Sequence, residues 1–394
     1  MLENKEQMEN LEERIRKRVG ARLRELRKAS GVTTVNLAMQ TGVSQGQLSK
    51  IENGKATLSV AMLTRLCQIF NRPLGYLFQS FEEMPRVLGT LTTVKGPEHI
   101  GIQWFAEEVR RRSEGSLTLI PLSPSQIGMP LAQVDQLSAG YIDMFVEEPV
   151  YYSSYVPGFS VFELPYLFRS ESHRNAFLGS SFFQERLIEP LSRNGIRFVN
   201  RRWNWVRGIE WVIAAKRPVV APSDLRGLKI RTTDSPVMHR FWKMLGARPV
   251  PVPWAEVGAA LRAGDIDALP THKAHLYPLE FCRHLRFVTL LGDLPPVLGV
   301  AINESKYRIL TPDIQTALIE ACDQAGAYFS RHVSQSEPAN EALNISRFKA
   351  AYIKVSLDPW RDASNHLRGE LIGEGLLDSD TVTAVDKALF DHGD

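Results

Sequence analysis

Residues 225–271 read LRGLKIRTTDSPVMHRFWKMLGARPVPVPWAEVGAALRAGDIDALPT, and two kinds of hydrophobic pattern alternate along them. A short apolar run that ends in Arg231 predicts a strand, and Pro236 after a serine predicts the start of a helix. Proline alternates with valine over 249–253, which excludes a helix and favours an edge strand. A second amphipathic helix is expected over 254–263. This succession indicates an α/β domain that binds a ligand at strand ends.

The whole chain has 394 residues, too many for one compact core, so two or three domains are expected. No apolar run is long enough to span a bilayer, and the charged N-terminus lacks a secretory signal. The cysteines, Cys67, Cys282 and Cys322, are too widely spaced for a metal cluster and suit a reducing compartment. We therefore expect a cytoplasmic protein without a membrane partner, metal or cofactor.

The positive charge is concentrated in the first part of the chain. Residues 1–80 carry 5 Lys and 8 Arg against 7 Glu and no Asp, a net charge of +6. Because the whole chain has a net charge of +3, the remainder carries −3. A polyanionic partner is therefore expected for the first domain alone.

Helical periodicity and capping residues in residues 1–80 predict five helices: 12–30, 33–42, 45–52, 59–70 and 73–78. The second and third are short and are joined by a turn that contains Gly42. Two short helices with such a turn are typical of a helix-turn-helix unit. The alternative is a small helical bundle whose basic face adheres to polyanions without specificity.

The residues around this turn, Leu37-Ala38, Gly42-Val43-Ser44-Gln45 and Leu48-Ser49-Lys50-Ile51-Glu52-Asn53-Gly54, resemble the phage-repressor DNA-binding family of the Cro/C1 or XRE type. The resemblance implies a recognition helix in the major groove of double-stranded operator DNA, and binding as a homodimer. It implies these DNA contacts: Ser44, Gln45, Gln47, Lys50 and Asn53. The two glutamines would read base edges, and the serine and asparagine would contact the backbone.

Residues 81–90 are expected to link this domain to a second one at 91–394, since Pro85 prevents the preceding helix from continuing. Short strands alternate with helices over the second domain. The predicted fold is therefore an all-α helix-turn-helix bundle followed by a two-lobe α/β domain with a cleft between its lobes.

Several motifs in 91–394 resemble the solute receptors of tripartite ATP-independent periplasmic (TRAP) transporters: 125–128 SQIG, 162–168 FELPYLF, 224–231 DLRGLKIR and 245–247 LGA. The resemblance implies a periplasmic-binding-protein-like domain that closes over a small organic acid. These receptors are normally exported, whereas this chain starts with a DNA-binding domain, so we expect a receptor reused as a sensor.

The resemblance implies seven ligand-binding residues: Arg231, Arg207, Trp254, Asn204, Glu147, Asp234 and Thr271. An arginine at a strand end provides the planar, always charged group that binds a carboxylate through two hydrogen bonds. The alternatives are a surface cation for the arginines, a core position for the tryptophan and a solvated loop for Glu147. The run 267–272, DALPTH, departs from the family pattern, and His272 there adds a residue able to titrate.

These features predict a cytoplasmic, ligand-responsive transcriptional regulator whose DNA binding is modulated by a small organic acid. One alternative is a DNA-binding protein whose C-terminal domain serves only in assembly. An enzyme is not expected, because the sequence has no phosphate-binding glycine loop, no GxSxG and no HExxH motif.

Overall fold

The structure is a computed structural model, and it describes residues 16–17, 19–24, 26–28, 30–56, 60–70, 86–90, 95–122, 130–208, 210–294 and 297–390. The chain forms two compact units, Met1–Met84 and Pro85–Asp394. The division falls inside the predicted linker. The last five linker residues form strand β1 (Arg86–Thr90) of the second unit.

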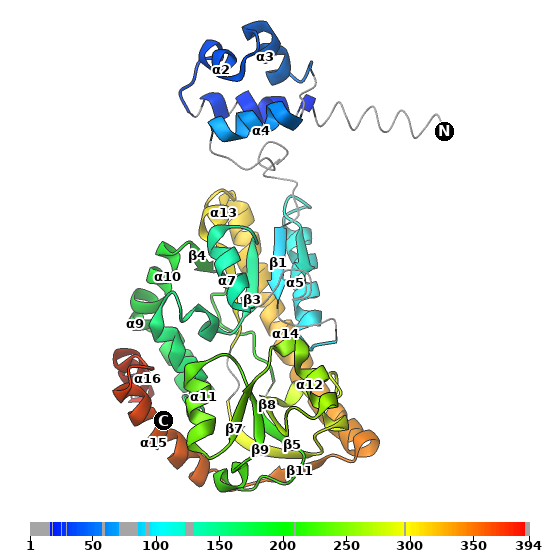
Figure 1. Ribbon diagram of the computed structural model, residues 1–394, viewed down its shortest axis with the longest axis vertical. Coiled ribbons are helices and arrows are strands. Elements are labelled where there is room, and N and C mark those ends of the chain that lie inside the picture. The colour runs from blue at the N-terminus through cyan, green and yellow to red at the C-terminus, as the bar shows by residue number, and fades with distance from the viewer. Residues whose placement is uncertain are drawn as a thin grey trace. The chain divides into compact units, whose positions relative to one another are not determined.

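The first unit is helical, with α2 (Thr34–Thr41), α3 (Gln45–Glu52) and α4 (Val60–Ile69) packed against a first helix described within 16–28 (Figure 1). Both predicted caps are present. The Thr33 and Ser44 hydroxyls each accept a hydrogen bond, of 3.1 Å, from the backbone of the first turn that follows. Gly42 ends α2 in the left-handed conformation, as the turn requires. The predicted helix 73–78 lies outside the described residues.

A partly buried ion pair links α3 to the first helix. Arg27 donates through Nε and Nη2 to the two carboxylate oxygens of Glu52, at 2.6 and 2.9 Å. Around it pack side chains that are at most 1% exposed: Leu23, Leu37, Leu48 and Leu66. The orientation of α3 therefore depends on one charged contact as well as on the apolar core.

The second unit contains two sheets. The first has the order β2-β1-β3-β10-β4, with β10 antiparallel to both neighbours. The second has the order β11-β9-β5-β8-β6-β7, and the proline-rich strand β7 lies at its edge as predicted. The remaining strands are β2 (Leu119–Leu122), β3 (Met144–Glu147), β4 (Ile196–Phe198), β5 (Trp211–Ala215), β6 (Lys229–Thr232), β7 (Arg248–Pro251), β8 (Ala268–His272), β9 (Phe287–Asp293), β10 (Gly299–Asn303) and β11 (Ala351–Lys354).

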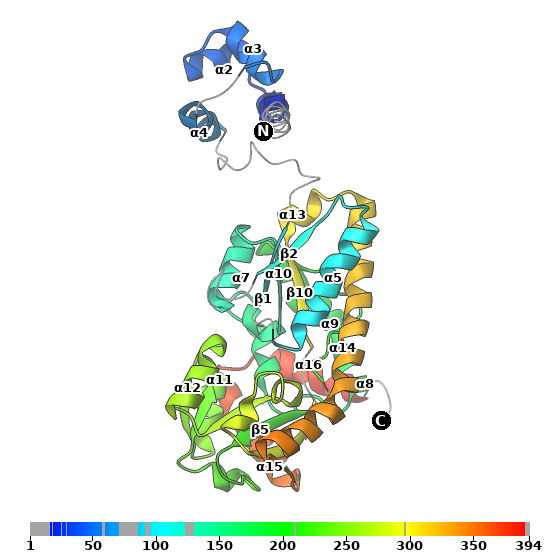
Figure 2. The same cartoon turned by 90° about the vertical axis from the view of Figure 1, so that its right-hand side faces the viewer.

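Helices cover both sheets (Figures 1 and 2). They are α5 (Glu98–Arg112), α7 (Pro130–Ala139), α8 (Glu171–Leu178), α9 (Ser181–Phe183), α10 (Glu189–Arg193), α11 (Pro236–Met244), α12 (Val257–Ala263), α13 (Glu304–Arg308), α14 (Pro312–Phe348), α15 (Asp358–Gly373) and α16 (Ser379–Phe390). Short turns of 3-10 helix form η2 (Pro149–Tyr152), η3 (Pro157–Glu163), η5 (Pro222–Leu225), η6 (Trp254–Glu256), η7 (Lys273–His275) and η8 (Phe281–Arg283). The π-helical turn η4 (Gln184–Ile188) lies between α9 and α10, just before Pro190, which has no N–H to donate.

The chain passes between the two sheets more than once. Strand β10 completes the first sheet after β5 to β9 have built most of the second, and α14 then leads back to β11. Figure 2 shows α14 running beside α5 and on toward the second sheet. The first lobe's core is completed from the far end of the chain, where Val382 and Val385 of α16 pack in one cluster with Phe159 and Phe162. The pocket described next is therefore built by segments far apart in sequence.

Candidate ligand-binding site

A pocket with about 570 Å³ of empty space, partly open to solvent, lies between the two sheets. The first lobe contributes the start of α5, the end of β3 and η2, and the second lobe contributes β5, the ends of β6 and β8, η6 and η7. Ligands of open α/β sheets bind outside the carboxyl ends of strands, which is where this pocket lies. Its lining residues are Glu98, Glu147, Glu148, Tyr151, Arg207, Trp211, Arg231, Thr233, Trp254, Pro270, Thr271, His272 and His275.

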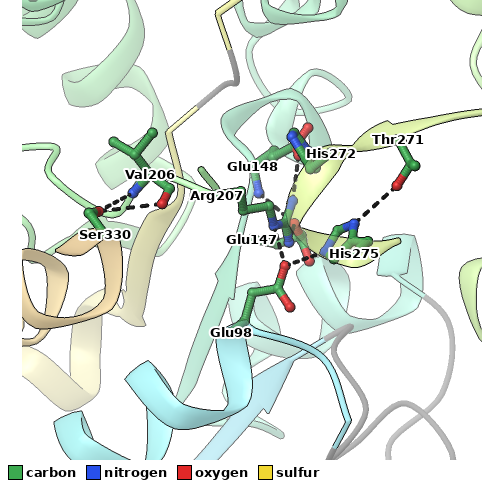
Figure 3. Close-up of polar contacts among 9 residues, drawn as sticks. All are labelled: Glu98, Glu147, Glu148, Val206, Arg207, Thr271, His272, His275 and Ser330. Atoms are coloured by element: carbon green, nitrogen blue, oxygen red, sulfur yellow. Dashed lines mark hydrogen bonds and ion pairs between the residues drawn. The ribbon is translucent and has the colours of Figure 1, made fainter. Parts of the chain in front are cut away.

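Arg207 lies at the centre of three carboxylates (Figure 3). Its Nε donates to Glu98 Oε1 at 2.7 Å, Nη1 donates to Glu148 Oε1 and Nη2 donates to Glu147 Oε1. The arginine is only 7% exposed, so this is a buried ionic network. Each nitrogen of its guanidinium is therefore already engaged by the protein.

The backbone around Arg207 is held in place by α14. The Val206 N–H donates to Ser330 Oγ at 2.8 Å (Figure 3). The Ser330 hydroxyl donates to the Asn204 carbonyl at 2.7 Å. Gly208 follows with a φ of 102°, and a Cβ there would lie 2.2 Å from Glu337 Oε1. Only glycine permits this close approach, which fixes the direction of the arginine side chain.

Two histidines join the carboxylates to the second lobe. His275 Nε2 lies 2.7 Å from Glu98 Oε1, and its Nδ1 lies 3.1 Å from the Thr271 hydroxyl. His272 Nε2 lies 3.1 Å from Glu148 Oε1, and all these contacts are drawn in Figure 3. Together with Arg207 and Glu147, these residues form what we call the Arg207 cluster: Glu98, Glu147, Glu148, Arg207, His272 and His275. The cluster connects the two lobes across the pocket.

The pKa values of Glu147, Glu148 and His272 are shifted from their ordinary values. Burial raises the pKa of Glu147 to about 7, against the opposing charge of Arg207. Burial also disfavours the charged form of Glu148, but Arg207 and the hydrogen bond from His272 outweigh it and hold its pKa at about 2. Burial lowers the pKa of His272. At neutral pH, His272 is therefore uncharged and adds no cation to the pocket, contrary to one option raised by the sequence.

Arg231 differs from Arg207, because its charge has no carboxylate partner within the described part of the chain. Its Nε donates to the Val252 carbonyl at 3.0 Å, and its guanidinium carbon lies 5.5 Å from the ring centre of Trp254. Burial lowers its pKa, but an arginine remains charged at any physiological pH. The two terminal nitrogens of Arg231 make no protein hydrogen bond among the described residues, so they can bind a carboxylate.

Five of the seven residues predicted to bind ligand line this pocket: Glu147, Arg207, Arg231, Trp254 and Thr271. Asn204 and Asp234 do not. Asn204 donates to the Asp323 carbonyl at 2.7 Å and faces α14, while Asp234 is exposed just before α11. These two side chains thus lie outside the pocket, and ligand contact stays a prediction for all seven residues.

The pocket also contains residues that were not predicted as ligand contacts: Glu98, Glu148, Tyr151, Trp211, Thr233, Pro270, His272 and His275. Glu148 and Tyr151 follow β3 directly, so their place at a strand end was a usable signal. Glu98 is 177 residues from His275, its partner, and no local pattern indicates that pair.

The residues predicted to contact DNA are all exposed on or beside α3: Ser44, Gln45, Gln47, Lys50 and Asn53. Ser44 caps the helix through its hydroxyl, and the Asn53 amide donates to the Ser49 carbonyl at 2.8 Å. Neither hydrogen bond prevents the exposed side chains from reaching a ligand. Contact with DNA stays a prediction.

The profile of the family described as bacterial extracellular solute-binding protein, family 7, matches residues 88–368. The chain belongs to this family. A second profile, for a helix-turn-helix domain, matches residues 18–75. The predicted fusion of a helix-turn-helix unit with a TRAP-receptor-like domain is thus confirmed, and so is the predicted fold class.

Relatives of this family 7 chain are periplasmic binding proteins. It is 28% identical over 304 residues to the 2,3-diketo-L-gulonate-binding periplasmic protein of Escherichia coli, which covers 76% of this chain and 90% of the relative. Its fold is similar to that of a TRAP periplasmic solute-binding protein from Roseobacter denitrificans with bound L-galactonate (TM-score 0.69, 20% identity, 79% of this chain and 100% of that chain). A Shewanella oneidensis TRAP protein with bound succinate is equally similar (TM-score 0.69, 21% identity, 77% and 99%).

Both matched families are binding families rather than families of enzymes. Across the described ranges, no group of three or more His, Cys, Asp or Glu side chains is arranged to hold a metal ion. Within those same ranges, no helix is both long and apolar enough to cross a membrane.

Proposed function

We propose that this family 7 chain is a cytoplasmic, ligand-responsive transcriptional regulator. In this proposal the helix-turn-helix unit binds double-stranded operator DNA as a homodimer, and the receptor-like domain binds a small organic acid that modulates DNA binding. The observation that carries the proposal is that one chain joins an exposed recognition helix, α3, to a pocket with an unpaired arginine, Arg231.

The organic acid is supported by the chemistry of Arg231 and by the relatives. A planar guanidinium over an aromatic ring, with both terminal nitrogens open, binds a carboxylate through two hydrogen bonds. The Escherichia coli relative is named for binding 2,3-diketo-L-gulonate, and the solved structures hold L-galactonate and succinate. All three are carboxylates.

Regulation requires that ligand binding and DNA binding share a conformational equilibrium. A ligand held between two lobes favours the arrangement in which both lobes contact it. If that arrangement has a different affinity for DNA, the two sites are coupled, and the coupling is equal in both directions. DNA should then change the affinity for the acid by the same factor.

The test is a titration of operator DNA, selected from genomic fragments, in the presence and absence of organic acids. We expect an acid that binds the protein to change the DNA affinity of the wild type and of an Arg193→Ala control, whose arginine is exposed on α10. The Arg231→Ala variant should bind the same DNA without responding to the acid. An acid that binds the wild type and leaves its DNA affinity unchanged would refute the proposal.

One observation favours the alternative that the second domain serves only in assembly. All three nitrogens of Arg207 are engaged by protein carboxylates, so the positive charge of Arg207 is compensated by the protein without a ligand. Thermal-shift measurements with a panel of carboxylic acids distinguish the two functions. Stabilisation that is lost in Arg231→Ala supports ligand binding, and a melting temperature unaffected by every acid supports assembly.

A further inference from the structure

Each side of the pocket has polar atoms without a protein partner among the described residues. They are hydrogen-bond donors on the second lobe and acceptors on the first. On the second lobe, the terminal nitrogens of Arg231 are donors without a protein acceptor among the described residues. On the first lobe, Glu147 and Glu148 each use only Oε1. Glu147 Oε1 accepts from Arg207 and from the Glu148 N–H at 3.1 Å, and Glu148 Oε1 accepts from Arg207 and His272.

The second oxygens of Glu147 and Glu148 have no hydrogen-bond donor within the described parts of the chain, and neither is completely shielded from solvent. Buried carboxylate oxygens are costly to leave without a donor. A bound ligand that fills the pocket displaces the water they would otherwise contact. It must therefore bring donors to the first lobe as well as acceptors to Arg231.

The charge of the pocket indicates which kind of hydrogen-bond donor the ligand carries. Three carboxyl groups, Glu98, Glu147 and Glu148, line it against two arginines, Arg207 and Arg231. Glu147, whose pKa burial raises to about 7, is only partly ionised at neutral pH. A ligand with a carboxylate and no cation still adds a negative charge to an enclosed space whose own negative charges already balance the two arginines. Hydroxyl groups would satisfy the open oxygens, but they would leave that excess charge uncompensated.

We propose that the ligand is a small amino acid whose carboxylate binds Arg231 and whose ammonium group lies against Glu147 and Glu148. An ammonium group supplies three donors and one positive charge, which matches both needs of the first lobe. The aromatic rings of Tyr151 and Trp211, which also line the pocket, suit a neighbouring cation. This inference rests on the proposed function only in requiring that the pocket binds a carboxylate.

The ligand class differs from those in the two solved relatives described above. L-galactonate and succinate are anions without an ammonium group. In this proposal the acidic pair Glu147-Glu148 at the end of β3 binds the ammonium group, because it places two carboxyl groups beside the pocket. The acidic pair would therefore determine the specificity for amino acids, while Arg231 can bind the carboxylate of any organic acid.

The experiment is titration calorimetry on the full chain without DNA. Three matched series of equal carbon number serve as probes: amino acids with the ammonium at the α or at the terminal carbon, the corresponding hydroxy acids and the corresponding dicarboxylic acids. The variants are Glu147→Gln and Glu148→Gln, and Glu107→Gln is the control because that carboxylate is exposed on α5. Melting curves identify a variant that fails to fold, and the other variant then decides.

We expect one or more amino acids to bind more tightly than the hydroxy acid and dicarboxylic acid of the same length. Glu147→Gln or Glu148→Gln should weaken that amino acid about tenfold or more, the size of a lost charged hydrogen bond, and should not weaken the other two series. The control should bind like the wild type.

Tighter binding of a hydroxy acid or dicarboxylic acid than of every amino acid would overturn the inference and leave the proposed function intact. Failure of all amino acids to bind at millimolar concentration would also overturn it. Loss of acid-dependent DNA binding, with amino acid binding retained, would instead refute the proposed regulation alone.

Discussion

Replacement of Arg207 with Met removes the charge around which Glu98, Glu147 and Glu148 are arranged. Methionine fills a similar volume with an apolar chain, so the loss of the guanidinium dominates the effect. Removal of one partner from a buried ion pair costs about 3–5 kcal/mol, because the other charge stays buried without compensation. Three carboxylates lose their partner here, so we expect at least that loss in the second unit at pH 7.

The loss should depend on pH in a direction set by the carboxylates. In the wild type, Arg207 helps hold the pKa of Glu98 and of Glu148 below the usual value of 4.5, and the stabilising contribution of Glu148 disappears only as pH falls toward about 2. Without the arginine, burial raises both pKa values against the histidine partners that remain, so each carboxylate becomes protonated at a higher pH than in the wild type. The difference in stability between wild type and variant should therefore be largest near pH 7 and should narrow toward pH 4.

Melting curves recorded from pH 4 to pH 8 measure this difference. A loss of about 3–5 kcal/mol corresponds to a decrease of roughly 5–8 °C in melting temperature for a unit of this size, because the entropy of unfolding is about 2.1 cal/mol/K per residue. The control is Arg110→Met, because Arg110 is exposed on α5 and pairs with Glu107 at the surface. The reasoning is wrong if Arg207→Met has the same melting temperature as the control at pH 7. It is also wrong if the difference in melting temperature between wild type and Arg207→Met does not become smaller as pH falls.

Three further predictions concern single contacts. Arg231→Lys keeps the charge and loses the planar pair of donors, so carboxylate affinity measured by calorimetry should fall about tenfold; equal affinity would exclude the proposed geometry. The pKa of Glu147 is raised to about 7, so ionisation of this group reduces stability as pH rises from about 4.5 through 7. Denaturant unfolding should show that Glu147→Gln gains stability relative to the wild type between pH 5 and pH 8, and a constant difference would count against the raised pKa. Arg27→Met should destabilise the first unit by about 3 kcal/mol and weaken DNA binding, unlike a Lys28→Met control on the exposed side of the same helix.

The sequence predicted correctly those helix ends and that edge strand which depend only on neighbouring residues. Ser235 caps α11 with Pro236 in its first turn, and Gly264 ends α12 in the left-handed conformation, both as the sequence suggested. Proline cannot donate to a ladder, which correctly placed 249–253 at a sheet edge. These elements needed no knowledge of distant residues.

The order of strands and the ionic cluster had no such local signal. Strand β10 lies between β3 and β4, and Glu98 meets His275 only after both sheets have assembled. The place of Asn204 outside the pocket could not be predicted either. Asn204 and Trp205 both donate to carbonyls of α14, at Asp323 and Cys322, and no local pattern in the sequence indicates these contacts with a helix more than 100 residues away.

The packing of α16 into the first lobe has a consequence during synthesis. Because Val382 and Val385 complete the core around Phe159 and Phe162, the pocket-bearing unit cannot finish folding before the last residues leave the ribosome. Residues 1–84 form a separate compact unit and emerge first. At about 5–20 residues per second, translation of the remaining 310 residues takes on the order of 15–60 s. Every new molecule thus passes through a period in which the unit proposed to bind DNA is complete and the unit proposed to bind a ligand is not yet fully synthesised.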